Sequence, residues 1–201
     1  MTLQNLNYPL DFKFKITTIS SDFSITDRNG NNVAYVREKL FRLKEDVLVY
    51  SDSSKEEKLF QIKANQWLDF NASYSLRNLI DNTNYGRVSR RGMKSIWRAS
   101  YDIKDHNDIT KFTITEDNAL VKFFDSFVSG IPIIGYFSGY ILNPTYSVKD
   151  ASDKTVFQLK KQPSFFGRKF KLEQQIDIDN QDETLIILSL LMMVLLERSN
   201  G

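Results

Sequence analysis

Five basic residues lie close together in the stretch RVSRRGMKSIWR, which runs from residue 87 to residue 98. No acidic residue separates them, and Trp97 belongs to the same stretch. Cations grouped in this way attract anions such as phosphate groups, and an aromatic side chain beside them can enter an interface. The candidate anion-binding residues here are Arg87, Arg90, Arg91, Lys94 and Arg98.

A second basic stretch, FQLKKQPSFFGRKFKL, runs from residue 157 to residue 172 and also contains no acidic residue. Its candidate residues are Lys160, Lys161, Arg168, Lys169 and Lys171, with Phe165 and Phe166 nearby. If the fold brings both stretches onto one face, they form one anion-attracting patch. Otherwise these cations cover outer strand faces and protect sheet edges.

The sequence offers few groups for covalent or metal catalysis. It has no cysteine, no G-x-S-x-G motif and no phosphate-binding loop, because the stretch GIPIIG is followed by Tyr136 instead of lysine. His106 is the only histidine and lies in a predicted exposed turn, so a two-histidine zinc site cannot form. We therefore expect a non-enzymatic protein without a cofactor or metal ion. A hydrolase that uses carboxylates is the alternative from another class.

The acidic stretch DIDNQDE, residues 177–183, raises the question of calcium binding. Counted from Asp177, the glycine of a calcium loop would be Asp182 and its bidentate glutamate would be Leu188. The pattern therefore does not fit. Strand alternation followed by helix capping accounts for the same carboxylates.

The elements that must position these residues are mainly strands. A chain of 201 residues with 41% hydrophobic content can bury the core of a single domain, residues 1–201. We expect the protein to be cytoplasmic. DFKFKITTI alternates Phe12 and Phe14 with Lys13 and Lys15, and KFKLEQQIDID alternates from 169 to 179. Turn signals such as Asn29-Gly30 separate these runs, which predicts about a dozen strands.

Residues 185–196 are apolar except for Ser189 and predict a helix over about 182–198. Twelve helical residues extend only about 18 Å, whereas the hydrocarbon of a bilayer is about 30 Å thick. We therefore expect no transmembrane segment. The helix is apolar on every side, so it must be buried on every side. We expect the strands to surround it.

One segment departs from the strand pattern. Apolar residues at helical spacing predict a short helix near 118–129. The uncharged stretch 130–142 that follows is expected to cover the core as loop and strand, with a membrane-dipping loop as the alternative.

The chain resembles the LURP-one-related branch of the Tubby C-terminal-like superfamily, which also contains the phospholipid scramblases. The resemblance rests on DFSITDRNGNNVAYVREKL, GYILNPTYSVKD, FQLKKQPSFFGRKFKL and IDIDNQDETLIILSLLMMVLLE. It implies a closed twelve-stranded antiparallel β-barrel enclosing a hydrophobic C-terminal helix. Because Tubby domains bind phosphoinositides, it also favours a lipid ligand, but no family binding residue matches here one by one.

Two hypotheses of function follow. The first is a non-enzymatic cytoplasmic domain, peripheral at the membrane, that associates with anionic phospholipid headgroups through the basic residues named above. The second is a protein-interaction or scaffold module with no lipid role. Nucleic acid is a weaker partner, because a formal net charge of +2 attracts a polyanion little over long range.

Overall fold

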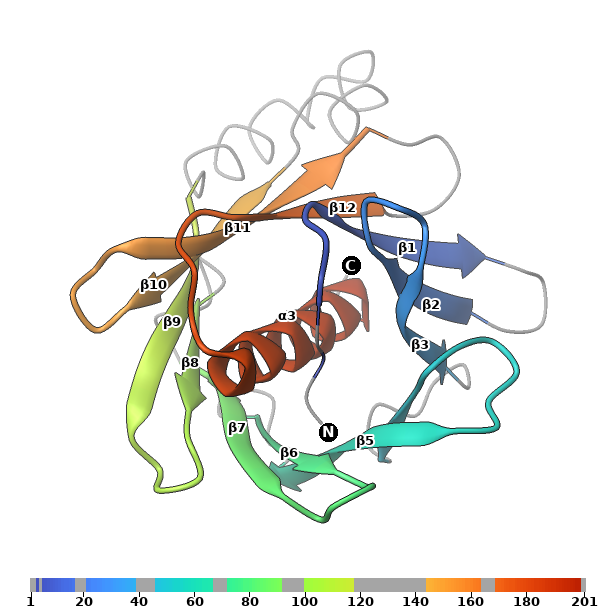
Figure 1. Ribbon diagram of the computed structural model, residues 1–201. Coiled ribbons are helices and arrows are strands. Elements are labelled where there is room, and N and C mark those ends of the chain that lie inside the picture. The colour runs from blue at the N-terminus through green and yellow to red at the C-terminus, as the bar shows by residue number, and fades with distance from the viewer. Residues whose placement is uncertain are drawn as a thin grey trace, which may run out of the picture.

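The structure is a computed structural model of the chain. It describes residues 3, 5–16, 21–38, 46–66, 72–91, 100–117, 144–163 and 169–199. These residues form one closed β-barrel and one long helix (Figure 1).

Each strand pairs antiparallel with its neighbour in the sequence, and β1 pairs with β12 to close the barrel. The predicted closed twelve-stranded antiparallel barrel is confirmed. The strands are β1 (Leu10–Ile16), β2 (Ser21–Thr26), β3 (Asn32–Glu38), β4 (Val47–Tyr50), β5 (Lys58–Gln66), β6 (Ser73–Asn78), β7 (Asn84–Arg90), β8 (Ser100–Lys104), β9 (Thr110–Glu116), β10 (Thr145–Asp150), β11 (Thr155–Gln162) and β12 (Lys169–Gln174).

The alternation read from the sequence sorts side chains between the two faces of the sheet. Phe12 and Phe14 of β1 are buried, whereas Lys13 between them is partly exposed. The predicted turn at Asn29-Gly30 joins β2 to β3, and Gly30 adopts a φ of 83°. Glycine tolerates this left-handed conformation without a steric cost.

The helix α3 (Asn180–Ser199) lies inside the barrel, and its residues from Asp182 to Leu196 are buried. The predicted helix at 182–198 is therefore confirmed and extends slightly at each end. The helix packs most closely against β6, β7 and β8. On the opposite wall, Phe23 packs against Phe12 and Phe14 with ring centroids 5.8 and 4.5 Å apart.

The end of β12 differs from the sequence prediction. Alternation predicted a strand up to Asp179, but β12 ends at Gln174 and Ile176 is 41% exposed. The prediction was wrong there because the chain must leave the sheet before it can enter the barrel as a helix.

The predicted helix at 118–129 and the stretch 130–142 lie outside the described residues. Within the described ranges, no helix is both long enough and apolar enough to cross a bilayer.

The antiparallel order places five hairpins at one end of the barrel, which we call the mouth. These hairpins join β2 to β3, β4 to β5, β6 to β7, β8 to β9 and β10 to β11. The helix begins at the same end, and the chain before β1 crosses the opening there (Figure 1). The mouth therefore gathers residues from the whole length of the sequence.

Candidate functional site

The outward-facing arginines of the first basic stretch form ion pairs. Arg87 Nη2 lies 2.7 Å from Asp108 Oδ2, and Arg91 Nε lies 2.7 Å from Asp102 Oδ1. Exposed pairs of this kind add little stability. They do, however, compensate the positive charge that the sequence suggested for this stretch.

Arg90 faces the interior of the barrel instead of its surface. It shares the inward side of β7 with buried Val88. The Tyr101 hydroxyl donates a hydrogen bond of 2.8 Å to the Glu197 carboxylate. Burial and this nearby carboxylate raise the pKa of Tyr101, whereas the positive charge of Arg90 opposes that rise. Arg90 therefore belongs to an internal polar cluster and is unsuited to a surface patch.

Among the described residues, the two basic stretches do not form one face. β7 and β11 are separated in the barrel by β8, β9 and β10. Lys161 shares the inward side of β11 with Phe157 and Leu159. Lys94, Arg98 and Arg168 lie outside the described residues. The expectation of a single patch built from both stretches is thus not met by the described part of the chain.

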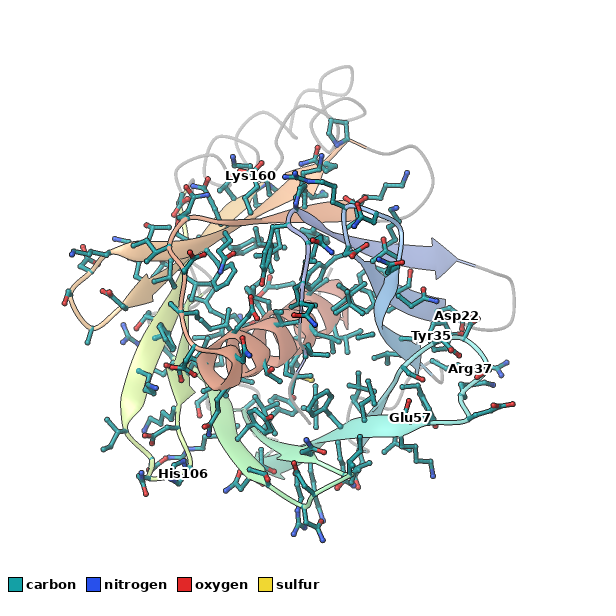
Figure 2. All side chains as sticks on the ribbon, in the orientation of Figure 1. Asp22, Tyr35, Arg37, Glu57, His106 and Lys160 are labelled. Atoms are coloured by element: carbon teal, nitrogen blue, oxygen red, sulfur yellow. The ribbon has the colours of Figure 1, made fainter. Side chains whose placement is uncertain are left out.

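A smaller set of cations does converge, on the outer face of β1, β12 and β11. In the strand register, Lys13 lies directly opposite Lys169, and Lys171 lies directly opposite Lys160. We call these four residues the lysine face. Figure 2 shows Lys160 on this side of the barrel. The sequence analysis did not identify Lys13 as a candidate anion-binding residue. Alternation placed it on a solvent-facing side of its strand but did not show which strand would lie beside β1.

Two carboxylates lie on the lysine face. Lys160 Nζ lies 2.7 Å from Glu173 Oε2, and Lys13 Nζ lies 3.2 Å from Asp11 Oδ2. Within the described ranges, Lys169 and Lys171 form no ion pair. Like charges directly opposite each other in a sheet destabilise it. The face therefore carries a surplus of positive charge that a bound anion would relieve.

The acidic stretch before the helix has structural partners at the mouth. Asp179 caps the helix, since its Oδ1 accepts hydrogen bonds from the backbone N–H groups of Gln181 and Asp182 at 3.0 and 2.9 Å. Asp182 forms an ion pair with Lys111 of β9. Burial raises the pKa of Asp182, and the hydrogen bond and charge of Lys111 oppose that rise.

The chain before β1 ties the helix to the β2–β3 hairpin. We call residues 3 and 5–9 the N-terminal strap. The Leu3 N–H donates to Thr184 Oγ1 at 3.1 Å, and the Tyr8 hydroxyl donates to Glu183 Oε1 at 2.8 Å. At the other side, Asn7 Nδ2 donates to Asp27 Oδ2 at 3.2 Å. The strap therefore closes part of the mouth.

We expect Tyr8→Phe to destabilise the fold by about 1–3 kcal/mol at neutral pH, because it removes a hydrogen bond to the buried carboxylate of Glu183. Burial already raises the pKa of Glu183, and the Tyr8 hydroxyl opposes that rise. The variant should therefore raise this pKa further. Since protonation then relieves the unpaired charge, the loss should shrink as the pH falls toward the pKa. Urea unfolding at neutral and mildly acidic pH measures both effects.

The matched control is Tyr50→Phe in β4, where the half-buried side chain has a hydroxyl that makes no hydrogen bond to another described residue. A loss for Tyr8→Phe that did not depend on pH would contradict the role given to Glu183.

The only histidine is exposed at the β8–β9 hairpin, as its turn context predicted (Figure 2). His106 lies at the periphery of the barrel, away from the helix. In the part of the chain that the structure describes, no three His, Asp or Glu side chains gather to hold a metal ion.

Comparison with known proteins assigns no family. No protein-family model matches the chain, and no curated protein matches its sequence. The X-ray structure of a protein from Arabidopsis thaliana matches with a TM-score of 0.46 and 15% sequence identity. The match covers 98% of this chain and 94% of that one.

Proposed function

We propose that this barrel is a non-enzymatic domain that associates with anionic phospholipid headgroups at a membrane surface through the lysine face. The observation that carries the proposal is the register that sets Lys13 against Lys169 and Lys160 against Lys171. Arg87 and Arg91 are not part of this proposed surface, because aspartates pair with them.

The physical support is the cost of placing like charges side by side. Two directly opposed lysine pairs weaken the sheet unless other charges compensate them. Asp11 and Glu173 compensate only part of this charge. Phosphate oxygens of a lipid surface would supply the rest. Each lysine near an anionic surface contributes about 1 kcal/mol of attraction.

The resemblance to the LURP-one-related branch of the Tubby C-terminal-like superfamily supports the same proposal. We infer that the chain belongs to this group, because a barrel around an apolar C-terminal helix is what the resemblance implied. Phosphoinositide binding by Tubby domains makes anionic lipid the first ligand to test. The proposed location is the cytoplasmic surface of a membrane.

The test is flotation of the protein with liposomes of graded phosphatidylserine content, compared with the variant Lys169→Glu/Lys171→Glu. We expect binding that increases with anionic lipid and decreases with salt. The variant should bind at least about 30-fold more weakly, since two lysines at about 1 kcal/mol each account for that factor. The carboxylate at position 169 would lie opposite Lys13, and the one at position 171 would lie between Lys160 and Asp11, so a circular dichroism spectrum must verify that the variant remains folded.

The matched control is Lys58→Glu/Lys63→Glu, which changes the net charge equally. Both residues are exposed on β5, across the barrel from β11 and β12 (Figure 1). Equal weakening in both variants would show that net charge acts without a defined face. No binding to any mixture would contradict the proposal and favour a protein partner.

A further inference from the structure

The mouth of the barrel contains a pocket between hairpins. The helix packs closest to β6, β7 and β8, whereas the N-terminal strap and the β2–β3 and β4–β5 hairpins enclose a pocket of about 340 Å³ on another side. This volume lies in the range of about 300–1,000 Å³ that is typical of small-molecule sites. The pocket is separate from the lysine face, which lies on the outer surface of β1, β12 and β11.

The pocket combines an apolar lining with polar groups. Its apolar lining residues are Leu3, Leu6, Val33, Leu59 and Phe60. Phe60 is held in place by Tyr85, with the two ring centroids 5.9 Å apart in an edge-to-face arrangement. A lining of this kind favours a ligand with an apolar body.

The charged residues of the lining are both carboxylates. They are Asp27 and Glu57, and no lysine, arginine or histidine lines the pocket among the described residues. The amide side chains of Asn5, Asn31 and Asn32 supply further hydrogen-bonding groups. An anionic ligand would therefore meet two negative charges without a compensating cation, whereas a positively charged head group would be attracted.

The two carboxylates have different roles. Asp27 is 6% exposed, and its oxygens accept hydrogen bonds from the N–H groups of Asn29 and Asn31 and from the side-chain amides of Asn7 and Asn31, at 2.8–3.2 Å. It therefore fixes the hairpin and the strap. Glu57 is exposed, and its carboxylate makes no hydrogen bond or ion pair with any residue that the structure describes. Figure 2 shows it beside β5 at the edge of the mouth. Glu57 is the carboxylate free to meet a ligand.

We propose that this pocket binds a small organic amine, with its apolar body against Leu6, Val33, Leu59 and Phe60 and its ammonium group against Glu57. This site is independent of the lysine face and takes a ligand of opposite charge. The two proposals can therefore fail separately.

The experiment is a titration of the isotope-labelled full chain followed by backbone amide NMR, with three probes that share a phenylethyl-sized body. The probes are 2-phenylethylammonium, 2-phenylethanol and phenylacetate. We expect the ammonium probe to shift the amide signals of the pocket-lining residues. The alcohol should bind more weakly, and phenylacetate should bind weakest.

Two variants and a control locate the site. Glu57→Gln keeps the shape and removes the charge, so it should weaken the ammonium probe about fivefold to tenfold, as expected for a charge-assisted contact near the surface. Ser51→Trp fills the pocket from its lining and should abolish binding. Glu56→Gln changes the neighbouring exposed carboxylate, which does not line the pocket, and should leave the affinity unchanged.

Three results would overturn the proposal. They are no shift with any probe at millimolar concentration, equal affinity for phenylacetate and the ammonium probe, or equal weakening by Glu57→Gln and Glu56→Gln. An unchanged far-ultraviolet circular dichroism spectrum verifies that each variant remains folded. None of these results depends on liposome binding.

Discussion

Replacing Leu188 and Leu191 with Asp should abolish cooperative folding. Both leucines have no exposed surface in the centre of the helix. Each change forfeits about 1.5–3 kcal/mol of apolar burial and places a carboxylate where no polar partner compensates it, which costs several kcal/mol more. The total is comparable with the roughly 5–15 kcal/mol that stabilises a typical domain. Soluble yield and urea unfolding followed by circular dichroism measure the effect.

The control uses the same chemistry on the surface. Ile80 and Ile109 are 50% and 62% exposed in the β6–β7 and β8–β9 hairpins. The variant Ile80→Asp/Ile109→Asp should unfold within about 1 kcal/mol of the parent chain. If the helix variant retained normal solubility and a cooperative transition, the barrel would not enclose its helix.

Gly86→Ala should cost about 2–6 kcal/mol. Gly86 has a φ of 130°, and a Cβ at this position would clash with the backbone carbonyl oxygen of Lys104 on β8. The cost combines backbone strain of about 1–3 kcal/mol with overpacking of about 1–3 kcal/mol. The residue adjoins a register shift between β6 and β7, beside buried Tyr85. The free energy of unfolding in urea measures the loss.

Gly30→Ala separates the two causes. Gly30 also has a positive φ, but a Cβ there would meet no atom within 4 Å. This variant should therefore lose only about 1–2 kcal/mol from the left-handed backbone. Equal losses at the two positions would show that close contact with β8 does not restrict Gly86.

Local patterns in the sequence were sufficient to predict about a dozen strands around a buried helix, whereas the closed twelve-stranded barrel was what the family resemblance implied. Residues 185–196 required burial on every side, and alternation as in β1 supplied a wall with one apolar face. The end of β12 was not predictable in this way. Ile176 continues the alternating pattern in sequence, but the position of the helix inside the barrel decides where the strand must stop.

The sites were harder to predict because they depend on register. Nothing local to Lys13 indicates that it will lie opposite Lys169, from which it is separated by almost the whole chain. Arg90 and Arg91 are neighbours in sequence, yet one faces the interior and the other pairs with Asp102. The pocket at the mouth joins three segments, and only the folded chain shows that its charges are both negative.

The order of the elements along the chain also has a consequence for biosynthesis. The helix that fills the barrel follows all twelve strands, and β12 must pair with β1 before the sheet closes. While the ribosome makes the strands, their apolar faces have no helix to cover them. A nascent chain of this kind exposes aggregation-prone surface until the helix has been made. Cells should therefore produce this protein most efficiently where chaperones hold the nascent chain until residues 180–199 emerge.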